Sequence, residues 1–299
     1  MTLGDNLKIG VLAVAVVLGV AAKSDAQGRP PMRAHTATET LPLTVAKANR
    51  SAGQSQVDIS TQGTRRVVVA NGIPRHKVGR FPNPGNPNRI KAQSYQFMMP
   101  LSPIAANQAT SGRKRTLFGV ALNGVPFDPG AAEFWQGNPR SGWQYEALGG
   151  AVPLGLDANF AHVQPTGAYH YHGLPVGLMQ QLGWSRSEAS PLIGYAADGF
   201  PIYAITATAN GRVIEMSSSY RLNPGKRPGA GPGGDHDGTF VQDYTYVKGA
   251  GALDECNGAF VNSAEYPEGT YAYFLTDSYP VIPRCHKGTP DPSFAKRRR

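Results

Sequence analysis

The chain has 299 residues, of which 40% are hydrophobic, so it can bury a core and a fully disordered protein is excluded. Its 36 glycines and 25 prolines follow no Gly-X-Y period. This excludes a collagen-like fibre and favours turns and short strands over a helical bundle. The formal net charge is +9, and that charge indicates an anionic partner only if the cations gather in the folded part.

The N-terminal residues 1–26 are predicted to be a secretory signal peptide. Lys8 supplies a positive start, and residues 9–22 form an apolar run before a cleavage site at Gln27. The run is shorter than the about 20 apolar residues that a membrane span needs. A cleaved signal is therefore favoured over an uncleaved anchor, and the mature protein is expected to be secreted or periplasmic, without a membrane segment.

The segments on either side of the expected body show no sustained apolar period. Residues 27–56 are rich in Ala, Thr, Pro, Arg and Gln and are predicted to be a disordered linker. Residues 293–299 end in four adjacent cations and are predicted to be a solvated basic tail. The folded domain is therefore expected over residues 57–292.

The positive charge is unevenly distributed along the chain. Residues 27–56 carry a net +3 and residues 296–299 a net +4. Within the body, residues 57–116 carry +9 and residues 117–295 carry −7. Net charge is thus poor evidence for a polyanionic partner, and the chain contains no motif for nucleic-acid binding. An envelope or extracellular polymer is the partner that stays open.

Short apolar runs in the body alternate with Gly, Pro and Asn. Three of these runs end in Asn-Gly or Asp-Gly, at Asn71, Asn123 and Asp198, and such pairs favour type I′ hairpin turns. Short helices are expected at residues 174–181, 186–189 or 131–136. We therefore predict a mainly β fold, a single large domain of short antiparallel strands and hairpins with few short helices.

The chain contains two cysteines, Cys256 and Cys285. In an oxidising compartment, two cysteines within one compact segment favour a disulfide over two free thiols. The bridge would close a loop of about 30 residues, which the chain-entropy account values at roughly 3–4 kcal/mol. A metal site that uses both cysteines is the alternative.

Three of the seven histidines lie between His162 and His172. Side chains alternate along a strand, so His170 and His172 are expected to point to one face. Pro165-Thr166-Gly167 suits a three-residue hairpin loop, with Pro in a type I turn and Gly in the left-handed position that follows. That loop pairs His162 with His170 and places three imidazoles on one face. Three nitrogen ligands with an open fourth position are typical of a catalytic Zn or Cu site.

Other residues are candidates for completing such a site. His76 is a candidate further ligand, and Asp198 and His236 are candidates for a catalytic acid or base. Metal-bound histidine usually donates its second N–H to a carboxylate or carbonyl, so Asp198 is equally a candidate for orienting a ligand. Plain turn chemistry is the alternative role for Asp198 and for the segment around His236. Without a metal, the three clustered histidines would be hydrogen-bonded structural or acid–base groups.

The tetrad Tyr169-His170-Tyr171-His172 matches the signature of the YHYH-domain family of secreted and periplasmic proteins. The resemblance extends over roughly residues 57–289 and is carried by the segments NGIP, FPNPGNPNRI, LFGVALNGVPFDPGAAEFW, LDANFAHVQPTGAYHYHGLP, ADGFPIY, LDECNG, YFLTD and IPRC. It implies a secreted context more than a reaction. In the family an acidic residue often precedes the position of His76, where this chain has Arg75, and a cation there weakens His76 as a ligand.

Two classes of function remain open. In the first, the protein is a secreted metal-binding protein whose metal activates water for hydrolase or lyase chemistry. In the second, it is a non-enzymatic protein that binds an envelope polymer or polysaccharide and has structural histidines. A set of aromatic residues would then line a groove, unless it forms core: Phe134, Trp135, Trp143, Tyr145 and Trp184.

Overall fold

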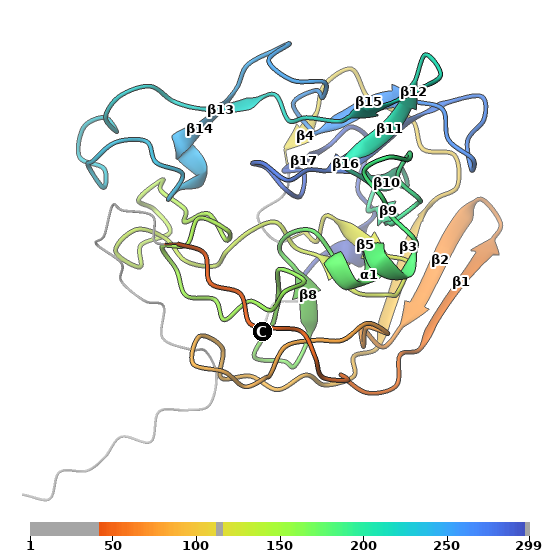
Figure 1. Cartoon of the computed structure of the whole chain (residues 1–299), viewed down its shortest axis with the longest axis horizontal. Coiled ribbons are helices and arrows are strands. Elements are labelled where there is room, and N and C mark those ends of the chain that lie inside the picture. The colour runs from red at the N-terminus through yellow and green to blue at the C-terminus, as the bar shows by residue number, and fades with distance from the viewer. Residues whose placement is uncertain (1–41, 112–115, 297–299) are drawn as a thin grey trace, which may run out of the picture.

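The computed structural model of the chain describes residues 42–111 and 116–296 (Figure 1). The expected signal peptide, the first part of the expected linker and the last three cations lie outside these residues. Within the described ranges, no helix is long and apolar enough to cross a membrane.

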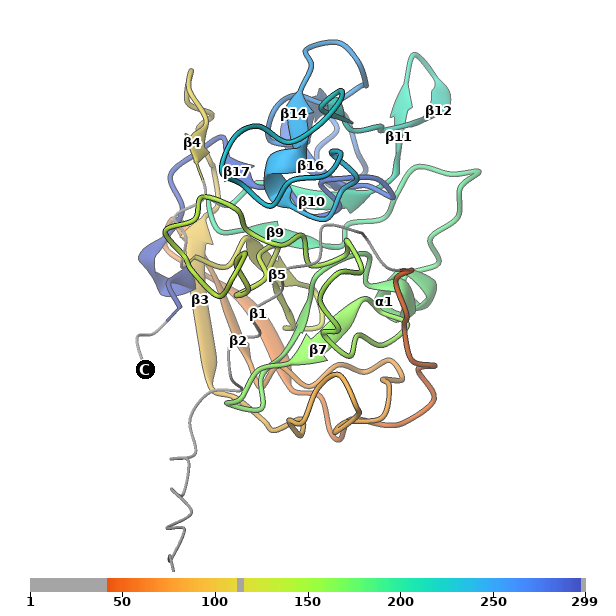
Figure 2. The same cartoon turned by 90° about the vertical axis from the view of Figure 1, so that its left-hand side faces the viewer.

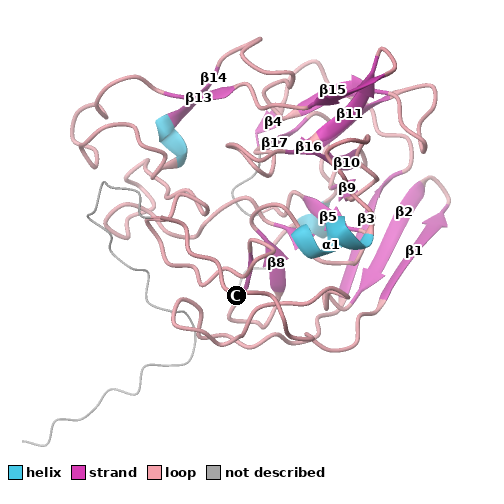
Figure 3. Ribbon diagram, in the orientation of Figure 1, coloured by secondary structure: helices cyan, strands magenta, loops and turns pink. Residues whose placement is uncertain are grey.

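The centre of the fold is an eight-stranded sheet (Figure 3). Five of its seven neighbouring strand pairs are antiparallel, whereas β10–β16 and β6–β8 are parallel. In order across the sheet, the strands are β15 (Gly258–Val261), β16 (Thr270–Leu275), β10 (Pro201–Ala204), β9 (Gly194–Ala196), β5 (Gly119–Ala121), β6 (Pro126–Phe127), β8 (Tyr169–Tyr171) and β7 (Ala161–Val163).

Smaller sheets surround this centre. A three-stranded antiparallel sheet consists of β1 (Val57–Gln62), β2 (Arg65–Ala70) and β3 (Tyr95–Pro100). Three two-stranded ladders pair β11 (Thr206–Ala209) with β12 (Arg212–Glu215), β13 (Tyr220–Leu222) with β14 (Tyr244–Tyr246), and β4 (Thr110–Ser111) with β17 (Cys285–His286). The helical elements are α1 (Val176–Gln181) and the 3-10 turns η1 (Val241–Asp243) and η2 (Pro292–Phe294). The prediction of a mainly β fold with few short helices is confirmed.

The largest apolar core packs on the eight-stranded sheet and contains Phe127, Tyr171, Ile202 and Tyr273. Burying such large side chains contributes about 1.5–3 kcal/mol each, which is how strands of two to six residues are held in place. The same core contains Cys256 and Cys285, and the predicted disulfide between them is confirmed, with 5.1 Å between the Cα atoms.

Two of the three predicted hairpins form, although not with the predicted turn type. Strands β5 and β6 flank Asn123-Gly124, and β9 and β10 flank Asp198-Gly199. A type I′ turn needs positive φ at both central residues. Here the glycines alone adopt it, at +77° and +95°, so the type I′ prediction is wrong.

The third predicted hairpin, at Asn71-Gly72, is absent because β2 pairs with β1 and β3 instead. The side chain of Asn71 redirects the chain there. Its Oδ1 accepts hydrogen bonds from the backbone N–H groups of Ile73 and Gln56, at 3.0 and 3.1 Å. Asn71 therefore forms a turn stabilised by its own side chain, through which the chain leaves the sheet. Asparagine commonly forms such turns as well as hairpin turns.

The predicted helix at residues 174–181 is confirmed as α1, whereas residues 186–189 and 131–136 form turns and bridges. The helix is short, and no acidic residue stands in its first turn and no basic residue in its last. Its buried side chains, Leu178 and Met179, pack into the main core. Tertiary packing rather than helix propensity thus stabilises this single turn and a half.

The described parts of the expected linker and tail lie against the body. Ala46 donates a backbone hydrogen bond to Leu156, and Arg50 exchanges two with Val78, at 2.8–2.9 Å. At the other end, Phe294 is fully buried against Phe97. The sequence pattern could not predict that these segments pack on the body, because each is held by a few backbone hydrogen bonds or one aromatic ring and has no apolar period.

Candidate metal centre

The histidine cluster is built on the hairpin of β7 and β8, at the edge of the eight-stranded sheet. The ladder pairs His162 directly with His170, as predicted. Gln164 closes the loop by donating its N–H to Ala168 O at 2.9 Å, and Gly167 follows with φ of +89°. A residue with a Cβ is strained at that φ, so the glycine allows the three-residue loop that sets the register.

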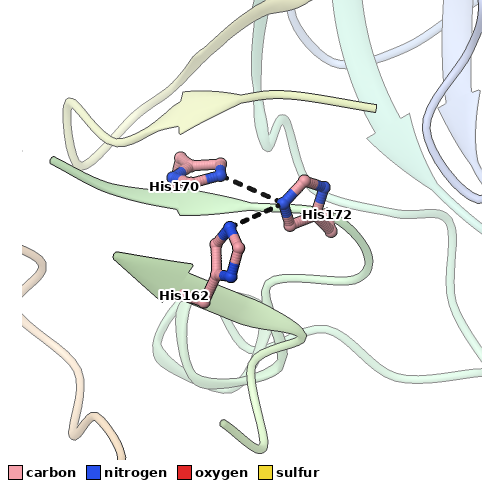
Figure 4. Close-up of side chains that lie close together, drawn as sticks. All are labelled: His162, His170 and His172. Atoms are coloured by element: carbon pink, nitrogen blue, oxygen red, sulfur yellow. Dashed lines mark hydrogen bonds between the residues drawn. The ribbon is translucent and has the colours of Figure 1, made fainter. Parts of the chain in front are cut away.

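The three imidazoles meet through the same ring atom (Figure 4). The Nε2 atom of His172 lies 3.0 Å from Nε2 of His170 and 3.1 Å from Nε2 of His162. Within the described residues these three form the group whose ligand atoms all lie close enough to hold one ion. A tetrahedral centre with Zn–N bonds of about 2.0–2.1 Å separates its nitrogens by about 3.3 Å. The two separations from His172 are close to that value, and all three ligand atoms lie within 4.8 Å of one another.

Backbone carbonyls orient two of the rings. Nδ1 of His162 lies 2.9 Å from Leu154 O, and Nδ1 of His170 lies 3.2 Å from Ala168 O. A carbonyl can only accept a hydrogen bond, so both Nδ1 atoms carry the proton. Their Nε2 atoms therefore present lone pairs to the centre, which is the arrangement that a metal-binding histidine requires.

Burial keeps the three histidines neutral. Loss of solvation lowers the pKa of His162 to about 3, and the neighbouring His170 adds to this shift. Burial likewise lowers the pKa of His170 and, with repulsion from the other two rings, holds that of His172 well below its usual value. The three rings are therefore uncharged at neutral pH, which is the form in which histidine binds a metal.

Two ion pairs, each with a buried carboxylate and a partly exposed cation, act on the cluster. Lys296 contacts Asp128, whose side chain is almost fully buried, and Arg284 contacts Glu146. The charge of Asp128 raises the pKa of His170, whereas that of Lys296 lowers it. Lys296 and Arg284 both lower the pKa of His172. Asp128 therefore favours a cation at the centre, and the two basic side chains oppose it.

The two tyrosines of the tetrad point to the opposite face of β8. The Tyr169 hydroxyl donates to Asp157 at 2.8 Å. The Tyr171 hydroxyl lies 2.5 Å from His76 Nε2 and accepts a hydrogen bond from Asn123 at 2.9 Å. Both rings are in the core. The alternation in Tyr-His-Tyr-His thus separates an anchoring face from a candidate binding face.

The structure does not bring the other candidate residues to the cluster. His76 lies behind β8, with its Nδ1 bonded to Lys77 O and its Nε2 to Tyr171. Asp198 is buried in the β9–β10 turn, where Tyr273 and Gly288 donate to it. His236 lies in the loop between β13 and β14 and bonds to Gly225 O. The roles proposed for these three residues from the sequence stay predictions.

Sequence reasoning missed the groups that surround the cluster. Asp128, Glu146 and Arg284 come from segments far from the hairpin, and Lys296 was assigned to a solvated tail. A local signal existed for Asp157, because Asp-Ala-Asn ahead of β7 is typical of a side-chain turn. Its Oδ1 accepts the N–H of Asn159 at 2.9 Å. No local signal identifies the distant charges.

The structure contains a cleft of about 300 Å³. Glu146, Phe160 and Leu174 contribute to its lining. The backbone N–H of His172 donates to Phe160 O at 2.8 Å, so one wall of the cleft is bonded to a histidine of the cluster.

The aromatic residues considered for a groove mainly form core. Tyr145 is fully buried, and Trp135 and Trp143 pack on its cluster. Trp184 packs on the main core and donates its indole N–H to Ala204 O.

Fold and site together define a β-rich, disulfide-closed protein with a buried three-histidine cluster on an edge hairpin. The model of the YHYH protein family matches residues 96–288, which is more than half of the chain, so the chain belongs to the YHYH protein family. No curated protein and no solved structure matched it.

Proposed function

We propose that the protein is a secreted or periplasmic metal-binding protein whose ion is Zn or Cu, held by His162, His170 and His172. The observation that carries this proposal is the convergence of three Nε2 atoms, two of them freed by Nδ1 bonds to carbonyls. Imidazole nitrogens suit both metals. The disulfide is compatible with an oxidising compartment.

The test is the metal content of the purified full chain after loading with zinc or copper. We expect near one ion per chain by elemental analysis, and loss of that ion in His170→Ala. His236→Ala is the matched control, because it removes a histidine that lies outside the cluster. Wild-type protein that stays metal-free after loading would refute the proposal, as would equal loss of metal in both variants.

The proposal has a second part, which depends on metal binding: the bound ion would support hydrolase or lyase chemistry. Three protein ligands leave a position at which a metal lowers the pKa of bound water to about 7. The cleft supports this step, because Glu146 and Phe160 line it and Phe160 is bonded to the backbone of His172. Burial raises the pKa of the Glu146 carboxyl above its usual value. Metal-dependent hydrolysis of a probe ester such as p-nitrophenyl acetate, lost in His170→Ala, tests it.

A further inference from the structure

Seven cations between residues 47 and 91 are exposed, and none of them forms a salt bridge with a described carboxylate. We call them the basic surface: Lys47, Arg50, Arg75, Lys77, Arg80, Arg89 and Lys91. The sequence contains no Asp or Glu between Asp58 and Asp128. The charge of this region is therefore not neutralised by its own segment.

Backbone bonds gather these residues from separate stretches of chain. Arg50 pairs with Val78, which brings it beside Lys77. Ala46 bridges to Asp157, and Asp157 Oδ2 accepts the N–H of Gly79 at 2.9 Å. Lys47 and Arg80, the next residues along each stretch, are thereby held near one another.

The same loop also continues to the histidine hairpin. Lys91 donates its N–H to Gly167 O at 2.9 Å, at the tip of the hairpin. In Figures 1 and 2 the orange-to-gold chain of this region runs along the lower edge of the molecule, below β7 and β8. The basic surface is thus formed by loops whose backbones are hydrogen-bonded to one another and to the hairpin.

The composition of this face selects among anionic partners. No large apolar side chain between Ala70 and Phe97 is exposed, so the part of the surface from Arg75 to Lys91 has no group to insert into a bilayer. Its two aromatic rings, Phe81 and Tyr95, are half-buried, so it has no stacking platform for single-stranded nucleic acid. The surface therefore offers a set of separate positive charges, which suits a polymer with repeating negative charges.

We propose that the basic surface binds an anionic polysaccharide, a polymer with a carboxylate on successive sugars. The seven cations lie outside the range matched by the family model, residues 96–288. The seven cations include no residue of the histidine cluster, so failure of this proposal would leave the metal proposal unaffected. Binding of this kind releases counterions and weakens steeply with salt.

The probe is polygalacturonate, tested against the full chain by titration at low salt, with neutral dextran as a blank. The test variant is the triple change Arg75→Gln, Lys77→Gln and Arg80→Gln. The matched control is Arg140→Gln, Arg212→Gln and Lys226→Gln, which removes three exposed cations elsewhere and changes the net charge equally. We expect the test variant to bind about tenfold more weakly and the control to bind like wild type.

Four outcomes would overturn the proposal. The first two are that wild type does not bind polygalacturonate and that its binding does not depend on salt. The third is that both triple variants bind polygalacturonate equally weakly. The fourth is that wild type binds anionic lipid vesicles or duplex DNA as tightly as polygalacturonate, or more tightly. Thermal unfolding of both variants is measured alongside, and unchanged midpoints are expected because all six side chains are exposed. A lowered midpoint in the test variant would assign its loss of binding to the fold and count against the proposal.

Discussion

His162 and His170 are direct cross-strand partners on β7 and β8, and Nε2 of each points to the Nε2 of His172. This relationship depends on the length of one loop. Because side chains alternate along a strand, a shift of one residue would move His162 to the opposite face. The cluster therefore forms only if the hairpin has this register.

The loop glycine should accordingly be sensitive to substitution. In Gly167→Ala the new Cβ would lie 2.6 Å from the Cβ of Lys91, and the alanine backbone would have to adopt a φ of +89°. We expect a loss of about 1–2 kcal/mol in unfolding free energy and weaker retention of metal. Gly142→Ala is the matched control, with φ of +78° and open space around its Cβ. Equal metal retention in both variants would show that the cluster does not depend on this turn.

The success of the sequence prediction at this hairpin has a local cause. Residues 162–172 contain the strand alternation, the turn residues and the ligands in one short stretch, so rules of local geometry are sufficient there. The disulfide was predictable for a similar reason, since two cysteines allow one pairing. At Asn71 the same kind of local rule failed, because its side chain caps the chain instead of turning it into a hairpin.

The surroundings of the cluster depend on contacts that no local pattern encodes. Asp128 and Lys296 are 168 residues apart in the chain, and Lys296 belongs to a run of charges that usually stays solvated. His76 was a reasonable candidate by residue type, but its position behind β8 follows from the packing of a separate loop. Composition could not reveal that loops carrying the cations of residues 47–91 are hydrogen-bonded to one another, since this pairing joins segments that are distant in the chain.

The charges beside the cluster predict opposite effects on metal affinity. Asp128→Asn removes an anion that favours a cation near His170 and leaves Lys296 without its partner, so metal should bind about fivefold more weakly, equivalent to about 1 kcal/mol. Lys296→Gln removes an opposing cation and should tighten binding by a similar factor. Competition titration with a zinc chelator measures both. Changes of the same sign in the two variants would contradict the electrostatic account.

The anchoring face predicts a loss of stability without a loss of metal. In Tyr169→Phe the buried carboxylate of Asp157 loses a hydroxyl donor at 2.8 Å, and a hydrogen bond to a charged group is worth about 1.5–3 kcal/mol. The hydroxyl lies on the face opposite the histidines, so metal content should not change. Chemical denaturation and elemental analysis test the two parts. Tyr246→Phe is the control, because the Tyr246 hydroxyl makes no hydrogen bond within the described residues, and a similar loss there would reject the explanation.

The disulfide predicts an effect that is separate from the metal centre. Cys256 and Cys285 are 29 residues apart, and a closed loop of that size is worth about 3–4 kcal/mol in the chain-entropy account. Reduction, or the double change of both cysteines to serine, should lower the free energy of unfolding by that amount. Metal content should persist in the folded fraction, since Cys256 lies just before β15, at the opposite edge of the sheet from the histidine hairpin, and Cys285 lies in β17, outside that sheet. The double variant should not respond to a reductant, and a wild type that is equally indifferent would show that the bridge does not stabilise the fold.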